Sequence, residues 1–432
     1  MRRTTCATPS RSVFTGLALS GLCLGAACAP PDAATGEGAT LFEGARIITG
    51  DGSAPIENGA FLIENGRFAL VGNAGAIDVP RGTPRVDLAG KTVMPALINA
   101  HAHLAATREE LVAQLEHFAY YGVGTVQSLG LDSSAVSLEM QTDTTRGIAR
   151  YLTAGRGITS PEPGRSEVPY WITSAEQATT AVRELATAQI PLVKIWVDDR
   201  NGQYEKLGPT LYGAVIEEAH RNGQRVAAHI FALEDAKGLL RAGIDAFAHG
   251  VRDIDIDDEG LALFRERPDV TLIPNLPDRG VATDLSWLAA TVPAERLQEM
   301  QAGATDRPDV QQRFAVQARN LARLNDAGVR IAMGTDGSAP WAAHLEMEDM
   351  VAAGMSPAQV IVAAARSSAE LLRLGDTGTV ETGRSADFLV LDANPLDDIR
   401  NTRRTAMVVA NGRLFLVRRD AGGRFVELTP VR

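Results

Sequence analysis

The sequence predicts an α/β protein: a (β/α)8 TIM barrel with a small β-sandwich domain formed by both ends of the chain. Three observations carry this prediction. The middle of the chain, residues 95–375, alternates short apolar runs with amphipathic helical segments. Both ends, residues 41–94 and 376–432, consist of short apolar runs broken by glycine-containing turns. The chain has 432 residues, enough for one large domain and a smaller one.

Eight apolar runs of strand length follow one another along the chain. They span residues 92–100, 122–130, 150–158, 192–197, 225–230, 246–251, 270–276 and 330–336. Between them lie segments such as residues 174–188, 211–223 and 233–243, in which apolar side chains recur at helical spacing. Strands that alternate with helices pair in parallel, and eight such units favour a barrel.

The two ends of the chain have the pattern of one β-rich unit. The first contains the hairpin signal Glu64-Asn65-Gly66, in which Asn-Gly suits a two-residue turn. The second contains the apolar runs "SADFLVLDANP" and "TAMVVANGRLFLV". Because both ends flank the predicted barrel, we expect them to form one small β-sandwich domain together.

The N-terminus has the pattern of an export signal. Three arginines precede a mostly apolar stretch, residues 13–27, that is rich in small residues and too short to span a membrane. We expect residues 1–27 to be a signal peptide and residues 28–40 a tether. Cys28 would be the lipidated first residue of a periplasmic or outer-membrane lipoprotein of a bacterium, attached to the membrane by its acyl chains. Plain cleavage near Ala27, which would release a soluble periplasmic protein, is the alternative.

Metal-binding side chains stand where the predicted strands end. In a barrel of this kind, chemistry takes place at the carboxyl ends of the strands. Six residues of ligand type belong to the first, fourth, fifth, sixth and eighth strands: His101, His103, Lys194, His229, His249 and Asp336. A strand would direct His101 and His103 to the same face. The chain has only seven histidines, so four of them at strand ends is a marked concentration.

Each of these residues also has an ordinary structural explanation. A single histidine in a strand is commonly a hydrogen-bonded core residue. Asp336 precedes Gly337 and suits the start of a turn, and Lys194 can extend its amine toward the surface. The joint pattern outweighs these separate explanations.

The segments that hold these residues resemble the amidohydrolase superfamily over nearly the whole chain after the export signal. The matching segments are "VMPALINAHAH", "VKIW", "AAHI", "DAFAHG", "GTDGS" and the tail "GTVETGRSADFLVLDANPLDDI". The chain is most similar in style to binuclear members, which include prolidase-like and ochratoxinase-like hydrolases. These motifs are specific for the superfamily and say little about the substrate.

The resemblance implies a site for two divalent metal ions, with Zn²⁺ as the expected metal. His101, His103 and Asp336 would hold one ion. His229 and His249 would hold the other.

Lys194 would bridge the two ions as a carbamate formed with CO₂, because burial disfavours a charged amine and favours the neutral, reactive form. The implied reaction is hydrolysis of an amide bond by a metal-bridged hydroxide. Asp336 would be the catalytic residue that accepts the proton of the hydroxide and delivers it to the leaving amine. The expected substrate is a small amide, such as an N-acyl amino acid or a dipeptide.

Three other functions are open. A lactone or ester hydrolase would use the same two metals. A mononuclear deaminase would hold one metal and release ammonia, but deaminase-like relatives lack the lysine. A non-catalytic relative that binds a partner would usually lose metal ligands, and this chain keeps all six.

Loops after the strands are expected to bind the substrate. The candidates are Arg156, Tyr170, Arg252, Asn275 and His344. An arginine can bind a substrate carboxylate through two hydrogen bonds, and a tyrosine or asparagine can hydrogen-bond a carbonyl. Surface ion pairs and loop caps explain the first four equally well. His344 either contacts substrate or orders the loop after Asp336.

The charge of the chain restricts its partners. The formal net charge is −11 and the sequence has no basic block, which argues against nucleic acid because phosphate binding needs a basic face. A small-molecule substrate is the expected partner, and a homo-oligomer is compatible with the sequence.

Overall fold

The computed structural model describes residues 38–143, 145, 147–410, 413–419 and 425–430. The predicted signal peptide, Cys28 and most of the predicted tether lie outside these residues, so export and lipidation stay predictions. Side chains are described up to residue 410.

Strands from both ends of the chain form one sheet, called here the terminal sheet. Its strands are β1 (Thr40–Ile47), β2 (Ile56–Glu64), β3 (Arg67–Asn73), β4 (Arg85–Asp87), β5 (Thr92–Pro95), β16 (Phe388–Leu391), β17 (Thr405–Ala410), β18 (Arg413–Arg419) and β19 (Phe425–Pro430). They pair in the order β19-β18-β17-β16-β5-β1-β2-β3, with β4 beside β1. The hydrogen bonds therefore join all nine strands in a single sheet, and the two packed sheets of a sandwich stay a prediction.

Phenylalanines from both ends of the chain form the core of the terminal sheet. Phe42 stacks on Phe61 with ring centres 4.9 Å apart, and Phe388 meets Phe61 edge-on at 5.1 Å. Aromatic pairs in these geometries add to the free energy of burial. The β2–β3 hairpin turns at Asn65 and Gly66, which both have positive φ angles, as the Asn-Gly signal predicts.

Ten short strands form the parallel part of the molecule. They are β6 (Leu97–Ala102), β7 (Val123–Ser128), β8 (Arg150–Thr153), β9 (Ile158–Thr159), β10 (Tyr170–Trp171), β11 (Leu192–Trp196), β12 (Arg225–His229), β13 (Ala246–Ala248), β14 (Thr271–Ile273) and β15 (Arg330–Ile331). One sheet has the order β6-β7-β8 and the other β10-β9-β11-β12-β13-β14-β15.

The two parallel sheets adjoin at both edges. On one side, the Gly157 amide just before β9 donates to the Gly130 carbonyl just after β7 at 2.7 Å. At the opposite edge, the Ala100 amide donates to the Met333 carbonyl at 2.8 Å, and the Thr335 amide donates to the His101 carbonyl at 2.9 Å. The fold is therefore α/β and TIM-barrel-like. A closed barrel of eight strands stays a prediction.

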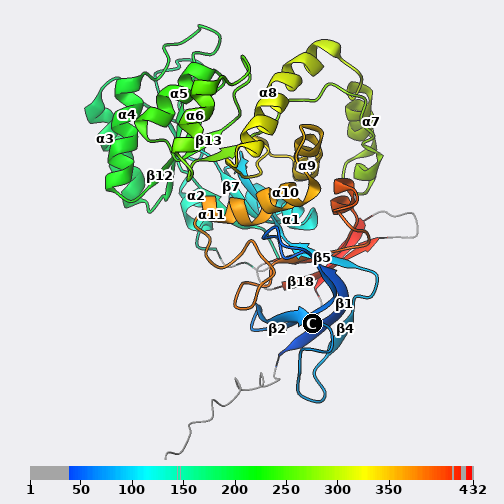
Figure 1. The fold of residues 1–432 in the computed structure, drawn as a ribbon. Coiled ribbons are helices and arrows are strands. Elements are labelled where there is room, and N and C mark those ends of the chain that lie inside the picture. Colours follow the sequence, from blue (N-terminus) through cyan, green and yellow to red (C-terminus); the bar gives the residue numbers. More distant parts are fainter. Residues whose placement is uncertain (1–37, 144, 146, 411–412, 420–424, 431–432) are drawn as a thin grey trace, which may run out of the picture.

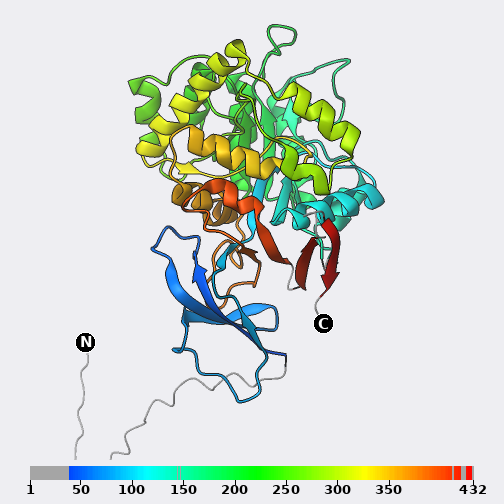
Figure 2. The same ribbon diagram turned by 90° about the vertical axis from the view of Figure 1, so that its right-hand side faces the viewer.

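Helices surround the parallel strands, and the terminal sheet lies below them (Figures 1 and 2). The α-helices are α1 (Arg108–Tyr120), α2 (Ala135–Met140), α3 (Ala175–Thr187), α4 (Pro209–Arg221), α5 (Leu233–Ala242), α6 (Asp258–Glu266), α7 (Ala294–Gly303), α8 (Pro308–Asp326), α9 (Ala342–Ala352), α10 (Pro357–Val362) and α11 (Ser368–Leu371). The shorter turns are η1 (Ser286–Ala290), η2 (Ala363–Ser367) and η3 (Ile399–Arg403). The helical patterns at residues 174–188, 211–223 and 233–243 correspond to α3, α4 and α5.

Helix α5 shows how the local sequence determines which face of a helix is buried and where the helix ends. Its buried residues include Leu233, Ala236, Leu239 and Leu240, which share one face at helical spacing. The helix ends at Gly243, whose φ of 97° is easily adopted only by glycine.

One predicted strand is divided in the structure. The run at residues 92–100 supplies β5, which pairs with β16 in the terminal sheet, and then β6, which pairs with β7 in the parallel sheet. Pro95 is paired with Phe388, so the terminal sheet extends past residue 94, where the predicted domain boundary lies. Apolar periodicity cannot reveal this division, because both strands are fully buried.

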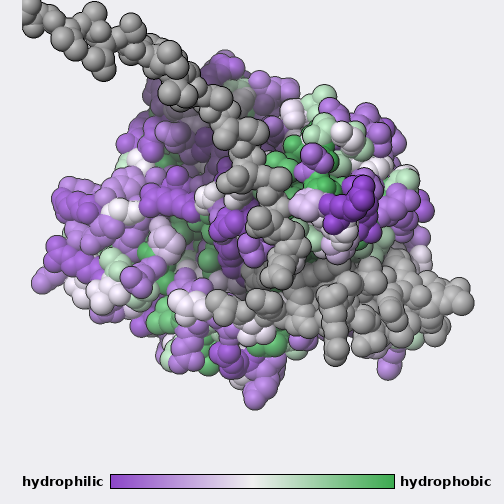
Figure 3. All heavy atoms as spheres, turned by 90° about the horizontal axis from the view of Figure 1, so that it is seen from below, coloured by the Kyte–Doolittle hydropathy of each residue, from purple (hydrophilic) through white to green (hydrophobic). Residues whose placement is uncertain are grey.

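The face of the molecule shown in Figure 3 has a surface that is ordinary for a folded protein. On this face, hydrophilic residues predominate and hydrophobic residues appear between them. Within the described part of the chain, no helix combines the length and the apolar character needed to cross a membrane. A homo-oligomer stays a prediction.

Candidate metal centre

The six predicted ligand residues lie on, or after, the parallel strands. In chain order they are His101 in β6, His103 directly after it, Lys194 in β11, His229 at the end of β12, His249 directly after β13, and Asp336 beyond β15. Parallel pairing brings these positions together from five separate segments.

Asp336 is at the centre of this group. Its Oδ1 lies 3.0 Å from Nε2 of His101 and 3.0 Å from Nε2 of His103, and its Oδ2 lies 3.4 Å from Nε2 of His249. One ligand atom from each of His101, His249 and Asp336 falls within 4.8 Å of the other two. The Asp336 side chain is 36% exposed, whereas the rings of His101 and His249 are buried. Solvent therefore reaches the Asp336 carboxylate, and the His103 ring is also partly exposed.

The backbone at the site is held in unusual conformations. His249, Asn275 and Asp336 have φ angles of 153°, 45° and 50°, which non-glycine residues seldom adopt. The amides of Thr335 and Asp336 both donate to the His101 carbonyl at 2.9 Å, which fixes the turn that carries Asp336. Such strain commonly accumulates at functional sites.

Gly334 of the "GTDGS" segment allows this turn to approach β6. A Cβ at position 334 would lie 2.8 Å from the Cβ of His101 and 2.5 Å from the side chain of Ile273. A larger residue would push Asp336 away from the histidines.

The charges of the group suit metal binding. Burial alone would raise the pKa of Asp336, but the neighbouring His101, His103 and His249 hold the pKa well below the usual range for an aspartate. Burial lowers the pKa of His101 to about 3 and that of His249 well below its ordinary value. At neutral pH Asp336 is therefore a carboxylate, and His101 and His249 are neutral imidazoles, which are the forms that bind metal.

Lys194 is fully buried in β11. Its Nζ accepts or donates no hydrogen bond among the described residues, and it lies 5.4 Å from the ring centre of Trp196. Burial lowers the pKa of Lys194 to about 7, although Asp336 acts in the opposite direction. A substantial fraction of the side chain is then a neutral amine at neutral pH.

His229 lies beside His249 but is bonded elsewhere. The two ring centres are 4.5 Å apart. The Nε2 of His229 lies 3.1 Å from Oδ2 of Asp198 and 3.3 Å from Nη1 of Arg200. Arg200 also donates to Asp198 at 2.6 Å. The structure thus brings His229 to the group while Asp198 occupies one of its ring nitrogens.

The residues present fit divalent metal ions. Nε2 of His101, both ring nitrogens of His249 and Nζ of Lys194 are buried without a hydrogen-bond partner among the described residues. Buried polar atoms rarely stay unsatisfied unless a ligand or water completes them. Imidazole nitrogens and a carboxylate are the usual ligands of Zn²⁺. The structure identifies neither the metal nor a carbamate on Lys194, so these remain predictions.

Asn275 contacts a predicted ligand residue directly. Its Nδ2 lies 2.8 Å from Nδ1 of His101, and its Oδ1 is buried without a partner in the described structure. If the Asn275 side-chain amide is rotated by 180°, so that its oxygen and nitrogen exchange places, Oδ1 would accept a hydrogen bond from Nδ1 of His101. Nδ1 would then carry the proton of the imidazole, and the lone pair of Nε2 would be available for a metal. Glu346 accepts hydrogen bonds from the Leu276 amide at 3.1 Å and so holds the loop that carries Asn275. The sequence predicted a substrate contact for Asn275; in the structure its side chain contacts His101, a place suited to positioning that ring.

We expect Asn275→Gly to weaken metal binding by about 10- to 100-fold, the usual cost of losing such an outer partner. Glycine tolerates the positive φ at this position, so the loop itself should keep its shape. Asn275→Asp should retain most of the affinity, because a carboxylate also accepts from Nδ1. Competition with a chelating dye measures this affinity, and Asn325→Gly, in helix α8, corrects for general effects of the substitution. Equal affinity in Asn275→Gly and wild type would show that Asn275 does not position His101.

Of the two roles predicted for His344, its position in the structure fits ordering of the chain after Asp336 better than substrate contact. His344 lies in α9 and is 1% exposed. Its Nδ1 bonds the hydroxyl of Thr402 at 2.9 Å, and its Nε2 donates to the Tyr121 carbonyl at 3.0 Å. Both ring nitrogens are used for packing α9 against α1 and η3. The chain turns into a helix soon after Asp336, so His344 faces the interior.

Arg156 and Tyr170 are engaged with each other. The Arg156 guanidinium lies 4.0 Å from the centre of the Tyr170 ring, and its Nε donates to the Val168 carbonyl at 2.6 Å. These contacts fasten the loop before β10, so a structural role accounts for both residues. Arg252, the fifth candidate, has its side chain in a cavity instead.

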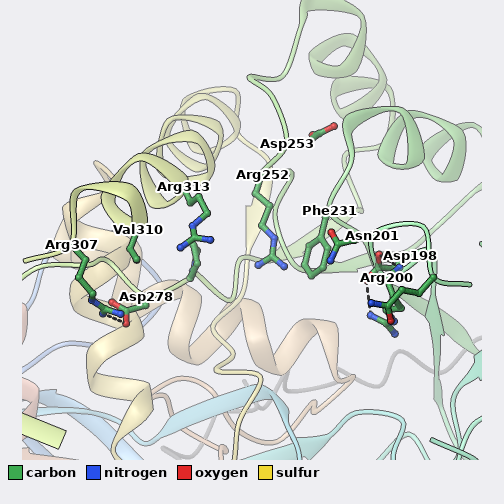
Figure 4. A pocket seen from close by; sticks show the side chains of 12 residues that line it. Asp198, Arg200, Asn201, Phe231, Arg252, Asp253, Asp278, Arg307, Val310 and Arg313 are labelled. Atoms are coloured by element: carbon green, nitrogen blue, oxygen red, sulfur yellow. Dashed lines mark hydrogen bonds and ion pairs between the residues drawn. The ribbon is translucent and has the colours of Figure 1, made fainter. Parts of the chain in front are cut away.

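Two cavities open beside the metal-binding group. The smaller, about 350 Å³, is lined by His103, His229 and Asp336 among others. The larger, about 740 Å³, is lined by residues that include Phe231 and Arg252, and Figure 4 shows its side chains. Arg200 lines both cavities, which places them next to each other.

Sequence reasoning missed the charged group next to His229. Asp198 and Arg200 follow β11, and Glu162 accepts from Nε of Arg200 at 2.9 Å. Asn99 was also missed: it is buried in β6 and donates to the Thr335 hydroxyl at 2.9 Å, which ties β6 to the turn that carries Asp336. The acidic pair that follows the fourth predicted strand was the available signal for Asp198.

Comparisons with known proteins agree with this site. The model of the amidohydrolase family matches residues 192–415. Imidazolonepropionase of Salinispora arenicola is 27% identical over 364 residues, covering 80% of this chain and 88% of that protein. Ochratoxinase of Aspergillus niger is 24% identical over 451 residues, covering 87% and 86%. The crystal structure of a putative prolidase from Bifidobacterium longum superimposes with a TM-score of 0.74 and 28% identity, covering 91% and 96% of the two chains.

The family match covers more than half of the chain, and it includes four of the six residues of the metal centre. Similarity to prolidase-like and ochratoxinase-like proteins extends over most of the remainder. Together with the histidines and carboxylate assembled around Asp336, these findings establish the class of enzyme. The chain belongs to the amidohydrolase family and is a metal-dependent hydrolase that acts on carbon–nitrogen bonds.

Proposed function

We propose that this enzyme hydrolyses the amide bond of small molecules, with N-acyl amino acids and dipeptides as the first candidates, and that it uses two divalent metal ions. The observation that carries the proposal is the position of Asp336. Its carboxylate contacts three histidines and faces the cavity that His103 and His229 line. A deprotonated carboxylate at this place can both bind a cation and accept a proton from the attacking water.

His101, His103 and Asp336 would hold one ion. His229 and His249 would belong to the other. The ions would lower the pKa of water and polarise the substrate carbonyl. Zn²⁺ suits this set of nitrogen and oxygen donors.

Lys194 would contribute as a carbamate. Its buried amine is partly neutral at neutral pH, so the nitrogen lone pair can attack the carbon of CO₂. The nitrogen then loses a proton, and the product is a carboxylate-like anion. Its two oxygens supply negative charge within an apolar strand, which nearby cations would stabilise.

Asp336 would move the proton that the reaction requires. Its lowered pKa keeps the carboxylate deprotonated at neutral pH, as a proton acceptor requires. The same oxygen then returns the proton to the nitrogen of the leaving amine. The partial exposure of Asp336 leaves room for a substrate to reach this carboxylate.

The first test is the metal content of the purified protein, produced without residues 1–27 in medium that contains zinc. We expect close to two metal ions per chain by elemental analysis, and release of free amino acid from members of a panel of N-acyl amino acids and dipeptides. Protein dialysed against a chelator should lose the activity and regain it when zinc returns. One metal per chain together with ammonia release would contradict the proposal in favour of a deaminase. Turnover of lactones alone would contradict amide hydrolysis.

A further inference from the structure

The larger cavity is rich in arginine and adjoins the metal centre. Figure 4 shows Arg252 and Arg313 extending into it from two different segments, with Phe231 beside Arg252. Phe231 also connects the cavity to the histidines, because its ring centre lies 4.4 Å from that of His229 and 5.3 Å from that of His249.

Most other charges of this cavity are neutralised in pairs. Arg200 donates to Asp198 at 2.6 Å, and Arg307 forms an ion pair with Asp278. The remaining aspartate, Asp253, accepts a hydrogen bond from a backbone amide and stands apart from the arginines in Figure 4. The cavity therefore keeps an excess of positive charge.

Arg252 supplies most of this excess. Its guanidinium forms no hydrogen bond or ion pair with any side chain that the structure describes, and it lies 3.2 Å from the centre of the Phe231 ring. The ring face attracts the cation and fixes its plane, but leaves its N–H groups free. Burial lowers the pKa of Arg252 to about 10, so the group is still charged at neutral pH. Arg313 is the second cation, since its ion pair with Asp309 at 3.4 Å, the one it forms among the described residues, is highly exposed and weak.

We infer that Arg252 selects the substrate by binding a carboxylate in this cavity. The substrates are then amides that carry a free carboxylate on the amine side of the scissile bond, with Phe231 in contact with their apolar part. The inference rests on the proposed amide hydrolysis. A planar guanidinium with free N–H groups binds a carboxylate through two hydrogen bonds. Neutral amides of the same shape should be poor substrates.

The test compares a carboxylate with its neutral counterpart in matched variants. The two substrates are N-acetyl-L-phenylalanine and its carboxamide. Hydrolysis of each is measured as the rate at which acetate is released. We expect Arg252→Met to reduce kcat/KM for the carboxylate by about 10- to 100-fold more than it reduces kcat/KM for the carboxamide. Arg252→Lys should retain part of the preference, because it keeps the charge without the planar fork. Arg319→Met, which removes an exposed arginine from the same helix as Arg313, should behave as wild type. An equal loss on both substrates would overturn the inference.

A binding measurement separates this inference from the proposed function. Calorimetry with 3-phenylpropanoate and with 3-phenylpropan-1-ol requires no hydrolysis. If no amide is hydrolysed, the proposed function fails, yet a loss of about tenfold or more in the affinity of Arg252→Met for 3-phenylpropanoate would still support the inference. Equal affinities of wild type and Arg252→Met for 3-phenylpropanoate would overturn it.

Discussion

Replacing Lys194 by alanine is expected to remove most of the bound metal and the activity of the protein. The substitution removes the buried amine that would become the proposed anionic bridge, so the two proposed sets of metal ligands would lose their shared ligand. Loss of an outer partner of a metal ligand typically costs 10- to 100-fold in affinity or activity, so loss of the bridge should cost more than about 100-fold. Elemental analysis and kcat with the best amide substrate measure both effects.

A rescue experiment distinguishes the bridge from a merely structural lysine. Formate, acetate or propionate can enter the space that the side chain leaves and supply the missing carboxylate. We expect these acids to restore part of the metal content and part of the rate in Lys194→Ala. Lys91→Ala removes an exposed lysine of the terminal sheet and is the matched control. Two metals and a full rate in Lys194→Ala would show that Lys194 bridges nothing.

The fold should survive loss of this lysine. Lys194→Met fills the same space without a charge, and burial of that charge opposes folding. In the metal-free wild type, the pKa is about 7 in the folded state and near 10.5 in the unfolded state, so the unfolded state binds more protons between these values. The free energy of unfolding should rise with pH in that window in the wild type and lack this contribution in Lys194→Met. Urea unfolding at pH 7 and pH 9 tests the difference.

Replacing Asp336 by asparagine is expected to lower kcat by about 100- to 10,000-fold, the range that a positioned proton acceptor supplies. The amide has nearly the shape of the carboxylate but cannot accept a proton from water or return it to a leaving nitrogen. The substitution also removes the negative charge that faces His101, His103 and His249, so the affinity for metal should fall as well.

Measurement of rate and metal content in the same samples separates these two effects. With zinc added until the site is saturated, kcat of Asp336→Asn should stay low, because the proton acceptor is still missing. Asp392→Asn removes an exposed carboxylate of the terminal sheet that pairs with Lys91, and it should match wild type. If saturating zinc restored the full rate of Asp336→Asn, Asp336 would be a ligand only, and another group would carry the proton.

Local pattern is enough to predict much of this protein. Alternation of side chains predicts that His101, in β6, and His103, directly after it, point to the same side, and glycine with asparagine makes the turn between β2 and β3. The motifs around Lys194 and His249 identify the family because each ligand lies in a short, characteristic segment. These features depend on neighbours within a few residues, which a sequence displays directly.

Contacts between distant segments needed the tertiary structure. Asn275 meets His101 across 174 residues, and no local pattern distinguishes that contact from a contact with substrate. His344 follows Asp336 closely in sequence, yet the start of α9 turns its ring into the core. Arg252 was one of several arginines in loops, and only the assembled cavity shows that its charge has no partner there. The sequence by itself determined which residues could bind metal, since their chemistry and strand positions are local. The tertiary structure decided which polar side chains are already satisfied by each other and which are free for a ligand, because that depends on which segments the fold packs together.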